Sequence, residues 1–291
     1  MGHKRILTVQ DISCVGQCSL TVALPVLSAC GHETCVLPTE MLSTHTGLPG
    51  AEVHHPGRET LDRFWHHWQR AGITFDAVYT GYLGSVDAVE VVLELVERLL
   101  KPEGLLIVDP AMADHGRMYA GLDGAYAESM KALSHRADIL IPNLTEAVML
   151  AGKPWREQPE EGAIRELMDC FQNPHVILTG VGFRPGETGA AYTCGGKTDF
   201  YTHPKVDGRF SGTGDLFAAC FTGVLLRGHS LSDAVRIAAD YTARCVLLTR
   251  EAPGRRYGIR FEEALPWLVR ALEKESSPPW GDRAFSGSSS G

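Results

Sequence analysis

The sequence predicts an α/β protein with three layers, in which helices cover both faces of a central, mostly parallel sheet. Two observations lead there. Short apolar, β-branched runs alternate with amphipathic helical stretches along the chain. Several of these runs are apolar throughout, which is typical of strands covered on both faces. Because we find neither an internal repeat nor a linker, we expect one domain over residues 1–275.

Each predicted element follows from its own pattern. The predicted strands are Arg5–Val9, Thr34–Leu37, Ala77–Thr80, Leu105–Val108, Ile139–Ile141 and Val176–Thr179. The helical stretches between them are Thr60–Arg70, Val86–Leu100, Tyr126–Leu133 and Gly162–Phe171. The second helical stretch has the clearest apolar stripe. A strand, a helix and a further strand in succession form a βαβ unit, so the sheet should be parallel.

The last third of the chain no longer shows the alternation of strands and helices. Thr188–Cys194 and Asp199–His203 are separated by a short Gly-rich turn and predict an antiparallel hairpin at a sheet edge. Helical patterns follow over Gly214–Arg227, Leu231–Thr249 and Phe261–Glu273. Residues 276–291 are rich in Ser, Gly and Pro, and we expect them to be a disordered tail.

Composition and charge exclude several classes of protein. The 291 residues are 44% hydrophobic and 21% charged, with a formal net charge of -8, which disfavours a nucleic-acid or membrane-surface binder. No run of about 18 or more apolar residues predicts a transmembrane helix. The first residues contain no signal-peptide pattern, so we expect a cytoplasmic protein. The eight cysteines form no Cys-x-x-Cys pair and should be free thiols.

Polar or small residues follow the predicted strands. In open α/β sheets, ligands bind beyond the carboxyl ends of the strands, so these positions are the candidate site. They are Asp11, residues 39–46, Gly81-Tyr82, Asp109–Asp114, Asn143–Glu146 and Thr179-Gly180.

The run Gly212-Thr213-Gly214-Asp215 precedes a predicted helix. Its glycines allow close approach to a ligand, and the N–H groups at a helix start attract anions. A carboxylate there could accept a proton from a substrate hydroxyl while those N–H groups stabilise a transferring phosphoryl group. A Gly-rich turn with a helix-capping Asp explains the same four residues equally well.

Two further segments carry carboxylates. Asp109 and Asp114 flank a Pro turn after a strand, as in a Mg²⁺ site or an ordinary Asx-turn loop. Asn143 and Glu146 have the spacing of a capping box, and they could also lie near phosphates and a Mg²⁺ shell. These residues alone leave both readings open.

Taken in order, these motifs resemble the ribokinase-like superfamily, specifically the pyridoxal/pyridoxamine kinases of its vitamin-kinase branch. The resemblance covers residues 5–272. The Gly-Thr-Gly-Asp run is shared across the superfamily, whereas the Thr80–Ser85 and Ser43–Thr46 segments are more specific to pyridoxal kinases. The other supporting segments are Val9-Gln10-Asp11 with Gly16, Asp109-Pro110 with Asp114, and Pro142-Asn143 with Glu146.

The resemblance implies ATP-dependent phosphorylation of the hydroxymethyl group of a B6 vitamer. Asp215 would be the catalytic base, and the backbone of Gly212, Thr213 and Gly214 would form the anion hole. Members of this branch are usually homodimers that use ATP and Mg²⁺ and often respond to K⁺. The resemblance implies that Asp114 and Glu146 contact Mg²⁺. It implies that the ATP phosphates lie near Asn143, Thr179 and Thr213. The pyridine ring would contact Asp11, Thr46 and Tyr82.

The chain departs from the family pattern at four positions. Asp11 stands where a Ser is common, and its carboxylate would favour pyridoxamine over pyridoxal. Ala113 replaces a Gly, Ile141 replaces a Thr beside the ATP or monovalent-cation contact, and Gln17 replaces a His. The alternative functions are a hydroxymethylpyrimidine kinase of thiamin biosynthesis and a non-catalytic vitamin- or nucleotide-binding regulator on the same fold.

Overall fold

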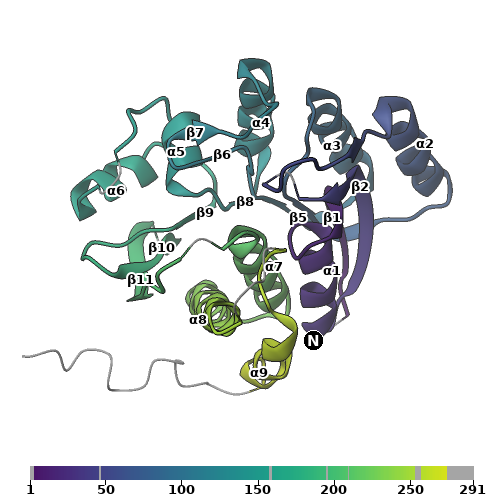
Figure 1. The fold of residues 1–291 in the computed structure, drawn as a ribbon. Helices are drawn as coiled ribbons and strands as arrows, with labels where there is room; N and C mark the ends of the chain where they lie inside the picture. The colour runs from purple at the N-terminus through teal and green to yellow at the C-terminus, as the bar shows by residue number, and fades with distance from the viewer. Residues whose placement is uncertain are drawn as a thin grey trace, which may run out of the picture.

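The computed structural model describes residues 3–45, 47–156, 159–194, 196–208, 210–252 and 257–273. Within them lies a nine-stranded sheet of order β11-β10-β9-β8-β5-β4-β1-β2-β3 (Figure 1). The six strands from β9 to β2 run parallel, while β10, β11 and β3 are antiparallel to their neighbours. The strands are β1 Arg5–Val15, β2 Glu33–Thr44, β3 Val53–His54, β4 Phe75–Thr80, β5 Leu100–Val108, β8 Ile139–Leu140, β9 His175–Thr179, β10 Glu187–Cys194 and β11 Lys197–Pro204. A separate antiparallel pair consists of β6 Ala113–Asp114 and β7 Arg117–Met118.

Helices cover both faces of the sheet (Figure 1). Strand residues alternate between the faces, so Ile6 packs in one core and Leu7 in the other. One core holds α1 Leu20–Ala29, α7 Thr213–Leu226, α8 Leu231–Arg250, the 3₁₀ turn η1 Glu262–Ala264 and α9 Leu265–Ala271. The other holds α2 Gly57–Arg70, α3 Val86–Leu99, α4 Gly124–Arg136, α5 Leu144–Leu150 and α6 Glu161–Met168.

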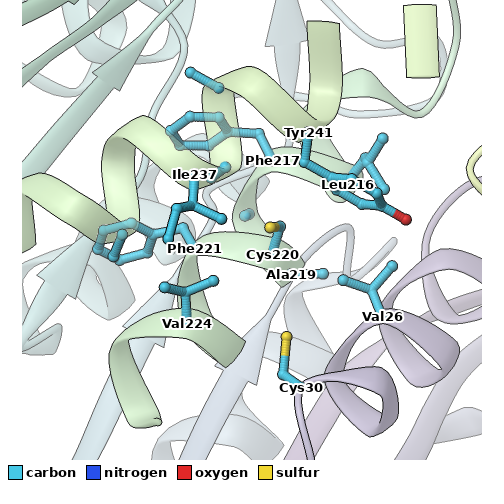
Figure 2. Packing of buried hydrophobic residues seen from close by; sticks show 14 of the residues in the cluster. Val26, Cys30, Leu216, Phe217, Ala219, Cys220, Phe221, Val224, Ile237 and Tyr241 are labelled. Atoms are coloured by element: carbon cyan, nitrogen blue, oxygen red, sulfur yellow. The ribbon is translucent and has the colours of Figure 1, made fainter. Parts of the chain in front are cut away.

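Helix α7 is the most buried helix of the first core and lies between α1 and α8 (Figure 2). Its side chains Phe217 and Phe221 stack with nearly parallel rings. Gly223 lies so close to Cys30, the C-cap of α1, that an added Cβ would be 2.6 Å from the Cys30 sulfur. This packing fixes the position of α7, and therefore the position of its N-terminal turn.

The three-layer prediction and the edge hairpin are confirmed. The predicted ends of the first two strands are wrong, because β1 continues to Val15 and β2 to Thr44. Asp11 and residues 39–44 therefore lie inside paired strands rather than in loops after them. The predicted helix Phe261–Glu273 is broken into η1 and α9. The predicted tail, 276–291, lies outside the described residues, and in the described ranges no helix is long and apolar enough to cross a membrane.

Candidate active site

The N-terminal turn of α7 is open. Gly212 precedes the helix with φ 85°, and no side chain caps the turn. In the part of the chain that the structure describes, no acceptor binds the backbone N–H groups of Thr213, Gly214 or Asp215. Unpaired N–H groups at a helix start attract anions, so this turn is a candidate site for a negatively charged ligand.

A neighbouring backbone carbonyl group leaves no room for a side chain at position 212. A Cβ at Gly212 would lie 2.3 Å from the carbonyl oxygen of Gln17, and a Cβ at Gly258 would be equally close to the same oxygen. The backbone N–H of Gln17 donates to the carbonyl of Tyr257 at 2.6 Å, and its side chain donates to Glu262. Segments from both ends of the chain thus hold the turn in place.

Asp215 lies in the first turn of α7, half-buried beside α1. Its Oδ2 accepts a 2.9 Å hydrogen bond from the backbone N–H of Ser19, which has a positive φ of 50°. Burial raises the pKa of the Asp215 carboxyl, and the Ser19 N–H opposes that rise. Within the described ranges the Oδ1 atom has no hydrogen bond, so it can accept a proton from a ligand.

Asp11 lies at an irregularity in the pairing of β1 with β2 and is only 4% exposed. Its backbone N–H donates to the carbonyl of Tyr82 at 3.1 Å, and its Oδ1 has no partner among the described residues. Burial raises the pKa of Asp11 to about 7, and the charges of Asp215 and Glu40 add to the rise. A hydrogen bond from Ser19 to the Asp11 carboxyl opposes the rise of its pKa. A buried carboxylate oxygen without a partner is costly, which favours a ligand group beside Oδ1.

Tyr82 follows β4 and faces a second aromatic ring. The centroids of the Tyr82 and Tyr119 rings are 6.4 Å apart, and the rings are tilted by 52°. Burial raises the pKa of Tyr119, and the carboxylates of Glu146 and Asp114 contribute. Tyr119 therefore lies between Tyr82 and the acidic residues Glu146 and Asp114, although no sequence pattern marked it.

The N-terminus of α5 is closed by a complete capping box. The Oδ1 of Asn143 accepts from the Glu146 N–H at 3.0 Å, and Glu146 Oε2 accepts from the Asn143 N–H at 2.8 Å. Glu146 Oε1 also accepts from the N–H groups of Met112 at 3.1 Å and Ala113 at 3.4 Å. Burial nevertheless raises the pKa of Glu146 to about 8. The box therefore fixes the 112–113 loop as well as the helix.

The remaining predicted residues surround this box. Thr179 pairs with Asn143 through an isolated parallel bridge, so these two polar side chains follow neighbouring strands at one edge. Asp114 is exposed in β6, whereas Asp109 is buried and its pKa is raised by burial and by the Glu146 and Asp215 charges. Thr46 lies outside the described residues.

The structure therefore gathers the predicted residues into two groups. Asp11 and Tyr82 lie on the Asp215 side, and Asp114, Asn143, Glu146 and Thr179 lie around the start of α5. Thr213, at the start of α7, donates its side-chain O–H to the Phe210 carbonyl at 3.4 Å. Sequence reasoning missed three residues of this region: Ser19, Glu40 and Tyr119. Glu40 alone had a signal, since it lies in the polar segment 39–46 assigned to the ligand edge.

Comparison with known proteins gives a consistent picture. Residues 48–259 match the family model described as phosphomethylpyrimidine kinase. A pyridoxine/pyridoxal/pyridoxamine kinase of Bordetella avium is 30% identical over 85% of this chain and 86% of its own length.

Solved structures agree with the sequence relatives. The crystal structure of pyridoxal kinase from Lactobacillus plantarum has a TM-score of 0.85 at 32% identity, covering 94% of this chain and 99% of that one. Leishmania donovani pyridoxal kinase, solved with ADP and pyridoxamine, shares the fold with a TM-score of 0.81 at 24% identity, over 91% of this chain and 95% of that one. The shared fold, the family match over most of the chain and these relatives show that the chain belongs to the pyridoxal kinases of the ribokinase-like superfamily.

Proposed function

We propose that this kinase transfers the γ-phosphoryl group of ATP to the hydroxymethyl group of a B6 vitamer, with Asp215 as the catalytic base. One observation supports this most strongly. The Asp215 carboxylate lies in the same helical turn as backbone N–H groups that bind no acceptor in the described part of the chain. A base and an anion site within one turn are what in-line phosphoryl transfer requires.

Asp215 would act on the acceptor hydroxyl. Its Oδ2 is held by the Ser19 N–H, so the carboxylate keeps one orientation and presents Oδ1 to the acceptor. The raised pKa of Asp215 makes it a stronger base than an exposed carboxylate. As the proton moves to Oδ1, the acceptor oxygen attacks the γ-phosphorus and ADP leaves on the opposite side.

The N-terminal turn of α7 would stabilise the charge on the transferring group. The N–H groups of Gly212, Thr213 and Gly214 precede or begin the helix, where the helix dipole adds to their effect. No side chain intrudes at Gly214, since an added Cβ there would meet open space. A phosphoryl group can therefore approach the backbone closely.

The donor chemistry around α5 suits Mg²⁺. In the described ranges, no three His, Cys, Asp or Glu side chains could hold a metal ion by themselves. Mg²⁺ in kinases commonly binds one or two carboxylates and completes its shell with water and substrate phosphates. Asp114 would be a direct ligand, and Glu146, engaged by three backbone N–H groups, would act through water. When bound, the ion neutralises phosphate charge.

The ATP phosphates would contact Asn143, Thr179 and Thr213, and the acceptor ring would lie against Asp11, Thr46 and Tyr82. The second candidate is a hydroxymethylpyrimidine kinase, because the matching family model carries the name phosphomethylpyrimidine kinase. A homodimer, a response to K⁺ and a cytoplasmic location remain predictions, and sedimentation and a K⁺ titration test the first two.

An acceptor panel tests the proposed function. ADP release is measured with ATP, Mg²⁺ and pyridoxal, pyridoxamine, pyridoxine or hydroxymethylpyrimidine, for the wild type and Asp215→Asn. We expect a B6 vitamer to have the highest kcat/KM. Loss of the base should lower kcat by about 10³-fold. Binding of ADP should persist in the variant, because the N–H groups of α7 remain.

Three outcomes would contradict the proposal. A higher kcat/KM for hydroxymethylpyrimidine than for every B6 vitamer would favour the second candidate. Full turnover by Asp215→Asn would remove the base from the mechanism. Absence of turnover with every acceptor in the wild type, together with retained ligand binding, would favour the non-catalytic regulator.

A further inference from the structure

A second buried carboxylate lies beside Asp11 and has not been assigned a role. Glu40 is in β2, across from the irregularity at which Asp11 sits in β1. Its side chain is 4% exposed, and its Oε1 lies 2.9 Å from Nδ1 of His55. Gly84, with φ 78°, lies so close that an added Cβ would be 2.1 Å from a Glu40 oxygen. The missing side chain at Gly84 is what allows the Glu40 carboxylate to reach the loop that follows β4.

The ion pair with His55 does not explain why Glu40 is buried. The His55 side chain is 65% exposed, so solvent screens any charge that the imidazole carries. Burying a carboxylate for such a partner costs more than burying an apolar side chain of similar size. Burial raises the pKa of Glu40, and His55 only opposes that rise. A positively charged ligand group beside Glu40 would offset this cost.

The Tyr82 hydroxyl lies in the field of both carboxylates. Burial raises the pKa of Tyr82 to about 12, with further contributions first from Glu40 and then from Asp11. The Tyr82 carbonyl accepts from the Asp11 N–H at 3.1 Å and from the Thr39 hydroxyl at 3.5 Å. Asp11 and Glu40 thus enclose the segment that carries Tyr82, and the Oδ1 of Asp11 has no partner among the described residues.

We propose that Glu40 determines specificity, and that with Asp11 it forms a two-carboxylate site for an ammonium group on the acceptor ring. This rests on the proposed function, since it requires the acceptor to lie on the Asp215 side. An aminomethyl group is protonated near neutral pH and would supply the positive charge. An aldehyde or a neutral alcohol at the same ring position would leave Asp11 Oδ1 unpaired and Glu40 with the exposed His55 as its ion-pair partner. The enzyme should therefore prefer pyridoxamine to pyridoxal and pyridoxine.

His55 is a positioning residue in this scheme. Its imidazole holds one oxygen of Glu40 from the solvent side, which leaves the other oxygen for the acceptor. Asp11 approaches from the neighbouring strand. Two buried carboxylates distinguish a charged acceptor from a neutral one, because a neutral group cannot offset the free energy lost when the carboxylates are removed from water.

The experiment compares kcat/KM for the four acceptors in the wild type, Glu40→Gln, Asp11→Ser and Glu40→Gln/Asp11→Ser. We expect the wild type to favour pyridoxamine. Glu40→Gln keeps the side-chain volume and should lower kcat/KM for pyridoxamine by about tenfold, mainly through KM. The value for pyridoxine should change less than about twofold. Asp11→Ser should show the same selective loss, and the double variant should lose less than the product of the two single losses.

Glu52→Gln is the matched control, because it makes the same substitution at an exposed acid just before β3. It should leave all four values unchanged. A wild-type preference for pyridoxine overturns the proposal without any variant, as does an unchanged pyridoxamine to pyridoxine ratio in Glu40→Gln. A larger loss with hydroxymethylpyrimidine than with pyridoxamine would overturn the ammonium assignment. If no acceptor consumes ATP in the wild type, the proposed function has failed instead.

Discussion

Two helices begin at the ligand edge with an acid at the same position, yet their first turns are built differently. In α5 the cap is Asn143, and the third helical residue, Glu146, accepts three backbone N–H groups. In α7 the cap is Gly212, which offers no side chain, and the third residue, Asp215, turns away to the Ser19 N–H. The acid thus closes one helix start and leaves the other open.

The difference depends on the cap residue. An Asn at the cap accepts from a backbone N–H of the first turn, and the acid at the third position accepts from the N–H of the cap residue. The start of the helix then has a purely structural role. A Gly at the cap, in a left-handed conformation, has no side chain to accept from the first backbone N–H groups. The acid at the third position is then able to contact other groups. The same spacing of residues therefore gives a closed helix start at α5 and, under the proposed function, a reaction centre at α7.

The largest effect should come from closing the open turn. Gly212→Ala would place a Cβ 2.3 Å from the Gln17 carbonyl oxygen at a φ of 85°. We expect kcat to fall by about 10²-fold, because displacement of the turn moves the N–H groups away from the phosphoryl group. Unfolding free energy should fall by about 1–3 kcal/mol. Steady-state kinetics and urea denaturation measure both.

Gly72→Ala is the control for Gly212→Ala, because Gly72 has a φ of 68° and nothing lies near an added Cβ. It should cost some stability and leave kcat unchanged. If Gly212→Ala retains wild-type kcat, the open turn is not the anion site.

Removing the cap of the closed first turn of α5 should lower kcat less than Gly212→Ala does. Asn143→Ala removes the cap of α5 and the 2.8 Å hydrogen bond from Asn143 to the Ala113 carbonyl. We expect unfolding free energy to fall by about 1–2 kcal/mol and kcat to fall by about tenfold or less. Thermal unfolding and kinetics measure these. A greater kcat loss than in Gly212→Ala would reverse the assignment of the two turns.

The smallest effect on kcat is expected for the last prediction, which concerns the dependence of stability on pH. The native pKa of Glu146 is raised to about 8, so the native state keeps a proton that the unfolded state loses near pH 4.5. Stability of the ligand-free protein should therefore fall as pH rises from about 5 to 8. Mg²⁺ favours the ionised carboxylates, so it should raise the melting temperature by a few degrees more at pH 8 than at pH 6.

Glu146→Gln should make the fall of stability with pH, measured by thermal unfolding, less steep; the raised pKa of Asp11 should leave part of it. Equal Mg²⁺ shifts at the two pH values would argue against a metal site beside the closed turn.

The sequence predicted the features that depend on local spacing. The sheet, the hairpin, the capping box and the Gly-Thr-Gly-Asp turn all follow from neighbouring residues. Helix α1 was missed because Pro25 lies inside it, and proline usually ends a helix. The strand β1 was predicted too short because Gln10, Asp11 and Ser13 are polar but buried.

Ser19 and Tyr119 had no local signal, and the partner of Glu40 could not be predicted from the polar segment 39–46. Ser19 reaches Asp215 across 196 positions in the chain, and the pairing of Glu40 with His55 requires β2 and the segment after β3 to be in place. Tyr119 meets Tyr82 only after β6 and β7 have formed. Such contacts are set by the tertiary fold, which a single sequence does not display.

The carbonyl of Gln17 lies against both Gly212 and Gly258. During synthesis on the ribosome, residue 17 emerges early and residue 258 emerges late, so the contact must wait for most of the chain. The parallel strands can pair and α7 can pack on α1 while translation continues, but the Gly258 contact beside the Asp215 turn forms only near the end. A nascent chain would thus hold a folded sheet before it acquires phosphotransfer activity.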